Sequence, residues 1–179
     1  MTDFFLYDYT GYVLINCPMK SFKNQKGFTL IELLVVIGIL AVLLAITLIA
    51  INPARQFSLA NNTKRSSDVN AILNAVNQYM ADHKGALPTT IAACTAVAPC
   101  DIAGPTGTGK VDLCSILVSD YLAALPVDPL TNNGTAVTSA GCASAYDTNY
   151  TIYQSTTNNR VTVSAPAAEL PGTVISVTR

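Results

Sequence analysis

One apolar segment near the N-terminus constrains the fold of this 179-residue chain more than any other feature. It runs from Phe28 to Ile51, and Glu32 is its one charged residue. As a helix, these roughly 24 residues extend about 36 Å, enough to cross a hydrocarbon layer of about 30 Å with some tilt. An ionised carboxylate one turn inside such a helix is unfavourable by roughly 2.5–3.5 kcal/mol. We therefore expect a membrane-spanning helix in which Glu32 requires a partner.

The sequence around this segment argues against an ordinary secretory signal peptide. Such a peptide has an apolar core of about 7–15 residues, followed by a small-residue cleavage site. Here the core is longer, and residues 50–53, which read AINP, make a poor cleavage site. Positive charge before an apolar helix stays on the cytoplasmic side, so we expect the N-terminus inside and the bulk of the chain outside. Basic residues after the helix weaken this asymmetry. The lysines before it are Lys20, Lys23 and Lys26.

Residues 26–35, which read KGFTLIELLV, resemble the processing site of type IV prepilins and of the pseudopilins of type II secretion and DNA-uptake machines. The resemblance implies that a prepilin peptidase cleaves between Gly27 and Phe28 on the cytoplasmic side and leaves the apolar helix on the mature protein. It also implies N-methylation of the new Phe28 amine. In that family the acidic residue that matches Glu32 attracts the N-terminal amine of a neighbouring subunit as it docks into a filament.

The physics of the membrane agrees with this role for Glu32. A buried carboxylate and a buried ammonium are each unfavourable alone, and they offset each other when adjacent. The alternative is that Glu32 lies near the membrane interface, where it snorkels or is protonated. The resemblance thus marks Gly27 and Phe28 as processing residues and Glu32 as an assembly residue.

The first 18 residues lack the basic character of a leader. A start at Met19 gives the leader MKSFKNQKG, which is short, basic and of the length usual in the family. We hypothesise that Met19 is the true start, which N-terminal sequencing of the uncleaved precursor would test. In either case residues 1–27 do not belong to the mature fold.

The length of the chain leaves room for one anchor and one head. A single domain of about 90 to 120 residues fits beside the helix. We expect a removed leader (1–27), a transmembrane and filament-core half of a long helix (28–52), an amphipathic half of that helix (53–84) and a globular head (85–179).

The pair Asn52-Pro53 has two interpretations. It can cap a fresh helix, or it can kink a helix that continues. We favour one long helix with a kink or a local break, which ends near a solvated His83 with Gly85 as its C′ glycine. Its apolar stripe should pack on a sheet, with Asp68 off the stripe. The stripe consists of Val69, Ile72, Leu73, Val76, Tyr79 and Met80.

Four cysteines remain once Cys17 is assigned to the leader, and all four lie in the part expected outside the membrane, where disulfides persist. Three pairings are possible. We favour Cys94 with Cys100 and Cys114 with Cys142, because the first pair closes a tight local loop. A metal site is the alternative, but the chain has no C-x-x-C pair and a single His.

From Thr89 to Gly109 the chain is rich in Ala, Thr, Pro and Gly and is expected to be a loop. Within it, residues 104–110 (GPTGTGK) have the G-x-x-x-x-G-K spacing of a phosphate-binding loop. The next residue is Val111 instead of the Ser or Thr that would hold magnesium, and we expect no buried strand before Gly104. We therefore predict no nucleotide binding.

Residues 111–125 are expected to form a short helix. Residues 125–130 (LPVDPL) then resemble the Pro-x-Asp-Pro segment that links the α/β loop to the sheet in pseudopilins and many short pilins. Those pseudopilins can bind calcium in the loop beyond it. Here no acidic ligand cluster is evident, because Asp128 and Asp147 are far apart in the sequence. Calcium is an open alternative, and no other cofactor is expected.

The last third of the chain alternates apolar and polar residues, as strands do. Residues 146–152 and 161–165 predict a hairpin, and residues 173–177 predict a third strand. A small antiparallel sheet against the C-terminal half of a long helix is the pilin architecture. We therefore expect an α+β fold in which a long N-terminal helix packs on a small antiparallel head.

The sequence contains no catalytic constellation, because the single His lacks partners and no two acids are spaced for acid–base work. We expect a structural subunit of a type IV pilus or pseudopilus and not an enzyme. The alternative is a membrane-anchored minor pseudopilin or binding protein that does not form the bulk filament.

The expected partners are other copies of the chain in a helical filament, the prepilin peptidase, the assembly machinery and the membrane. Nucleic acid is unsupported, since the chain has no basic run apart from the leader lysines. The resemblance implies a single-pass protein of the inner membrane before assembly, with a cytoplasmic N-terminus. After assembly it implies an extracellular pilus or a periplasmic pseudopilus.

Overall fold

A computed structural model of the chain describes residues 27–105 and 107–179. The predictions for Met19, Cys17 and the leader lysines lie outside these residues. The chain divides between Thr47 and Leu48 into two compact units.

Helix α1 (Leu30–Ile51) is continuous over 22 residues, and none of its residues is buried. It has a mean hydropathy of 3.2 over its most apolar window, and it is the one helix among the described residues that is long and apolar enough to cross a membrane. A helix that is apolar on all sides needs lipid or other apolar helices around it. Its length of about 33 Å matches the hydrocarbon layer.

The predicted interruption after α1 is a local break at Asn52. Its backbone is left-handed (φ 47°, ψ 77°), a conformation that Asn tolerates better than most residues. Helix α2 (Pro53–Asp82) begins at the next residue, where the missing N–H of Pro53 costs no hydrogen bond. The Asn52 side chain accepts a hydrogen bond from the Arg55 N–H at 3.4 Å. The cap and the break, which the sequence offered as alternatives, thus occur together.

The C-terminus of α2 differs from the prediction by one residue. His83 is the C-cap, and the next two residues, Lys84 and Gly85, have positive φ of 55° and 83°. The Gly85 N–H donates to the Met80 carbonyl at 2.7 Å. The left-handed C′ position is therefore Lys84, and Gly85 follows it. His83 is exposed, as expected, and its ring stacks on Tyr79 with 3.9 Å between the centroids.

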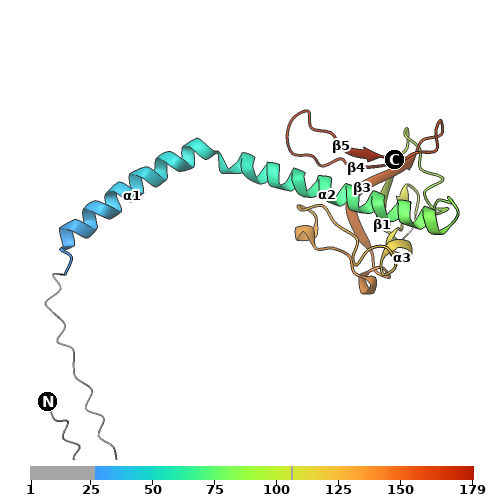
Figure 1. The fold of residues 1–179 in the computed structure, drawn as a ribbon, viewed down its shortest axis with the longest axis horizontal. Helices are drawn as coiled ribbons and strands as arrows, with labels where there is room; N and C mark the ends of the chain where they lie inside the picture. Colours follow the sequence, from blue (N-terminus) through green and yellow to red (C-terminus); the bar gives the residue numbers. More distant parts are fainter. Residues whose placement is uncertain (1–26, 106) are drawn as a thin grey trace, which may run out of the picture. The chain divides into compact units, whose positions relative to one another are not determined.

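A five-stranded sheet forms the head, in the order β2-β1-β3-β4-β5. The pair of β1 and β2 is parallel, and the other neighbours are antiparallel. Helix α2 lies across the sheet and contacts β4 and β5 (Figure 1). The strands are β1 (Cys100–Gly104), β2 (Lys110–Val111), β3 (Tyr146–Gln154), β4 (Val161–Ala165) and β5 (Ile175–Thr178).

The apolar stripe of α2 supplies the helical side of the core. Val69, Ile72, Leu73 and Val76 are fully buried and belong to one cluster with the inward side chains of the sheet. Strands β3, β4 and β5 correspond to the three predicted strands, with ends that differ by at most two residues. The fold is α+β, with a long apolar N-terminal helix, a second helix and a mostly antiparallel sheet.

Two predictions for the middle of the chain are wrong. The expected loop 89–109 contains strand β1, which is mostly buried and pairs with β3. The sequence of β1 is CDIAG, in which Ile102 is the single large apolar residue, so the strand lacks the alternation of apolar and polar residues that predicts a strand. The expected helix 111–125 is a single turn, α3 (Cys114–Leu117). It ends because Val118 is extended and Ser119 has a φ of 89°.

Two disulfides close the loops of the head. Cys94 is bonded to Cys100 at the start of β1, and Cys114 at the start of α3 is bonded to Cys142. These are the two pairs that the sequence favoured. Two short 3-10 helices, η1 (Asn132–Gly134) and η2 (Ser139–Gly141), lie between α3 and β3.

Candidate functional site

The predicted cleavage bond lies directly before α1. Gly27 and Phe28 are exposed and belong to no helix or strand, and 84% of Phe28 is accessible. A peptide bond in such backbone can enter a protease site without unfolding a helix. Cleavage at this bond stays a prediction.

Glu32 has a partner within its own chain. The Thr29 backbone N–H donates to Glu32 Oε2 at 2.8 Å, and the Thr29 hydroxyl donates to the same oxygen at 2.7 Å. In return, the Glu32 N–H donates to Thr29 Oγ1 at 3.3 Å. This reciprocal pattern is a capping box, with Thr29 as N-cap and Glu32 as the third helical residue. The T-x-x-E spacing was readable in the sequence, but the prediction considered only a partner in another subunit.

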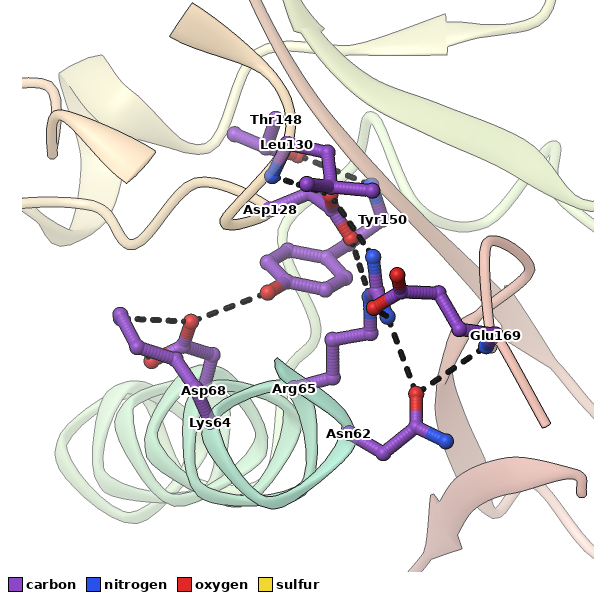
Figure 2. Close-up of polar contacts among 9 residues, drawn as sticks. All are labelled: Asn62, Lys64, Arg65, Asp68, Asp128, Leu130, Thr148, Tyr150 and Glu169. Atoms are coloured by element: carbon purple, nitrogen blue, oxygen red, sulfur yellow. Dashed lines mark hydrogen bonds and ion pairs between the residues drawn. The ribbon is translucent and has the colours of Figure 1, made fainter. Parts of the chain in front are cut away.

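A second group of polar residues is buried in the head around Arg65 (Figure 2). The Arg65 side chain is fully buried, and so is that of Asp128. Arg65 Nε donates to Asp128 Oδ2 at 2.5 Å, and Nη2 donates to Oδ1 at 3.2 Å. This is the two-pronged geometry that suits a guanidinium and a carboxylate. The hydrogen bond to Asp128 raises the pKa of Arg65 above its ordinary value, so the guanidinium is charged.

The remaining nitrogen of this guanidinium binds two further residues. Arg65 Nη1 donates to Glu169 Oε2 and to Asn62 Oδ1, each at 2.9 Å. The Glu169 backbone N–H also donates to Asn62 Oδ1, at 3.1 Å. Hydrogen bonds from Asn61 and from Arg65 lower the pKa of the Glu169 carboxyl.

These contacts tie α2 to two distant loops. Asp128 comes from the Pro-x-Asp-Pro segment, and its backbone N–H donates to the Thr148 carbonyl on β3 at 3.0 Å. Its Oδ1 also accepts from the Leu130 N–H at 2.9 Å. Glu169 comes from the loop between β4 and β5. One buried guanidinium therefore fixes both loops against the helix.

The position of Asp68 differs from the prediction for the polar face of α2. It is buried, with 7% of its surface exposed, although the sequence placed it off the core stripe. Its Oδ2 accepts from the Tyr150 hydroxyl at 2.9 Å, and Lys64 Nζ donates to both of its oxygens, at 2.9 and 3.0 Å. Burial and the nearby Asp68 carboxylate raise the pKa of Tyr150. Sequence reasoning missed Arg65 as well, because a single basic residue before an apolar stripe gives no local sign of a partner.

Residues 104–110, which have the spacing of a phosphate-binding loop, lie in a different structural setting from such a loop. A mostly buried strand does precede Gly104, contrary to the prediction. Beyond the glycines, however, the chain enters β2, and Lys110 pairs with Asp101 of β1. A phosphate-binding loop leads into a helix N-terminus, whose N–H groups bind the phosphate, and here a strand takes that place.

The acids considered for calcium do not fit a calcium site. Asp128 binds Arg65, and Asp147 accepts from the Asn149 N–H at 2.8 Å. Across residues 27–105 and 107–179, no three His, Cys, Asp or Glu side chains gather to hold a metal ion. Calcium binding requires six to eight oxygen ligands.

These features define a class of protein with an α+β head on a long, fully exposed apolar N-terminal helix that carries one acid at its start. Residues 22–48 match the family model described as the prokaryotic N-terminal methylation motif. This match covers a small part of the chain, and it supports a likeness to type IV pilins and pseudopilins. No curated protein and no solved structure matches it.

The motif is typical of pilins, which are structural proteins. Its leader implies processing by a prepilin peptidase and assembly into pili or pseudopili. The apolar helix together with the motif fits a membrane-anchored precursor.

Proposed function

We propose that this protein is a filament subunit of a type IV pilus or pseudopilus that polymerises through α1. The observation that carries the proposal is the 22-residue apolar surface of α1, none of which is buried by the chain itself. Within the filament, the α1 helices of neighbouring subunits bury this surface against one another in place of lipid.

Cleavage between Gly27 and Phe28 creates an amine four residues before Glu32. Within the described residues, the two hydrogen bonds that the Glu32 carboxylate accepts both go to Oε2, and both come from Thr29. Oε1 is then the atom that accepts the Phe28 amine of a neighbouring subunit. The capping box holds the carboxylate at the start of α1, so it is already oriented when the neighbour docks.

The ion pair between Glu32 and the Phe28 amine of a neighbour selects the register in which subunits dock, which packing of apolar helices alone does not. Lipid tails are as apolar as the side chains of α1, so exchange of lipid for another helix has little hydrophobic driving force. An uncompensated charge in the same environment is strongly unfavourable. A subunit that docks out of register would leave both charges unpaired, so the pair selects one register.

The Glu32→Ala variant tests the proposal. We expect it to insert into the membrane as the wild type does and to form no filaments, as judged by electron microscopy of sheared fibres and by membrane fractionation. Asp120→Ala, which removes an exposed acid of the head, is the matched control and should assemble normally. Normal filaments from Glu32→Ala would refute the pairing of Glu32 with a neighbour.

Mass spectrometry of the sheared fibres provides a second readout. We expect a mature chain that begins at Phe28 and carries one methyl group on its amine. A chain found in the membrane but absent from all fibres would instead favour a minor pseudopilin or anchored binding protein.

A further inference from the structure

The first two turns of α2 have no cover in the head. Residues 53–60 are exposed, with Ser58 half-buried, and 71% of Phe57 is accessible. In Figure 1 this part of α2 lies outside the area covered by the sheet. Short helical segments owe most of their stability to packing of an apolar face, so these turns lack their usual support.

The exposed turns combine an apolar face with positive charge. Pro53, Phe57 and Ala60 follow the helical period, so they lie on one face, and Arg55 lies on another. The sequence has no Asp or Glu between Glu32 and Asp68. A helix with an apolar side and basic residues is suited to the interface of a membrane, where the ring enters the acyl boundary and the cation meets phosphate.

The position of these turns along the chain points to the same environment. Arg55 and Phe57 follow Ile51, the last residue of α1, by only four and six residues. The headgroup layer extends about 5–7 Å beyond the hydrocarbon on each side. So short a connection keeps both side chains within reach of the headgroups when α1 spans the bilayer.

We propose that residues 53–60 form a membrane-interface segment in the precursor before assembly, in which Phe57 inserts below the headgroups and Arg55 binds lipid phosphate. The proposal rests on the membrane anchoring by α1 but concerns a segment that α1 does not include.

The chain contains no Trp, so a single introduced Trp reports its own surroundings. The test uses three full-length variants, Phe57→Trp, Leu40→Trp and Val97→Trp, reconstituted in vesicles of phosphatidylcholine and phosphatidylglycerol. Leu40 lies in the middle of α1, and Val97 is 96% exposed in the disulfide-closed loop of the head. All three positions are exposed in the chain, so the head should fold in each variant. The vesicles carry bromine either near the headgroup end or near the methyl end of the acyl chains.

We expect the Phe57→Trp variant to be quenched more by bromine near the headgroup end and the Leu40→Trp variant more by bromine near the methyl end. The Val97→Trp variant should be quenched by neither and should emit as Trp does in water. Adding Arg55→Gln to Phe57→Trp should reduce the quenching in vesicles with phosphatidylglycerol and change it less in vesicles of phosphatidylcholine alone.

Three results would overturn the proposal, and they are distinguishable. Quenching of Leu40→Trp without quenching of Phe57→Trp would leave the anchor in place and remove the interface segment. Absence of quenching in both variants would show that α1 does not lie in the bilayer, so the membrane anchoring itself would be wrong. A blue shift of Phe57→Trp that grows with the protein-to-lipid ratio and is insensitive to bromine would show that a second copy of the chain covers Phe57.

Discussion

The guanidinium of Arg65 and the carboxylate of Asp128 form two hydrogen bonds, of 2.5 and 3.2 Å, between side chains that are both fully buried. The two residues are 63 positions apart in the sequence. The pair therefore closes a long loop against α2, and the stability of the head depends on it.

Asp128→Ala should destabilise the head strongly, because it leaves the Arg65 guanidinium buried without its main counter-charge. Removal of one partner from a buried ion pair typically costs about 3–5 kcal/mol. Urea unfolding of the full chain in detergent micelles, followed by circular dichroism, measures the change. Asp120→Ala is the control and should stay within about 0.5 kcal/mol of the wild type. A double variant, Arg65→Met with Asp128→Leu, should recover much of the loss, and equal instability of the single and double variants would contradict this account.

Glu169 should give the head a dependence on acid pH. Its pKa is lowered in the folded state by the hydrogen bonds from Asn61 and Arg65, so the unfolded chain binds the proton more readily. The stabilisation is present above the ordinary Glu pKa of about 4.3 and is lost as the pH falls through the lower folded value. The difference in urea midpoint between wild type and Glu169→Gln should therefore be largest near neutral pH and should shrink as the solution is acidified below about pH 4. A difference that is constant from pH 7 to acid would show that Glu169 makes no pH-linked contribution.

The two disulfides should contribute unequally to stability. The loop-closure relation assigns about 2.2 kcal/mol to a pair separated by 6 residues and about 3.6 kcal/mol to one separated by 28 residues. Replacing both Cys114 and Cys142 by Ala should therefore lower the urea midpoint more than replacing Cys94 and Cys100. Peptide mapping without reduction checks the pairing first. A larger loss from the Cys94 and Cys100 variant would show that the short loop has a structural role beyond chain entropy.

Thr29→Val should loosen the first turn of α1. It removes the hydroxyl that accepts from the Glu32 N–H and donates to the Glu32 carboxylate, and loss of such a cap costs about 1 kcal/mol. Hydrogen exchange of the Glu32 and Leu33 amides in micelles should become about fivefold faster at this cost. Thr47→Val is the matched control, because the Thr47 hydroxyl donates to the Leu44 carbonyl within the same helix and caps nothing. Equal exchange rates of the Glu32 and Leu33 amides in the two variants would show that the capping box does not stabilise the first turn of α1.

The elements whose signal is local were predictable from the residues. An apolar run of the length of α1 favours a helix surrounded by lipid or by other apolar helices, and the alternation in β3 and β4 marks strands with one buried face. The motif at residues 26–35 is also local, since a peptidase reads adjacent residues. Strand β1 was missed because its small residues carry no alternation, and α3 was overestimated because its helical spacing continues past the point where Ser119 turns the backbone.

The sequence by itself indicated the apolar helix and the processing motif, because each depends on neighbouring residues and on the chemistry of lipid or protease. Only the tertiary structure decided which charges are buried. Arg65 and Asp68 look like surface residues of a polar helix, and their burial follows from partners at Asp128, Tyr150 and Glu169 that lie far along the chain. A buried charge is stable only where other segments place its counter-charge and hydrogen-bonding groups beside it. These segments are distant in the sequence, so no local pattern of residues predicts the contact.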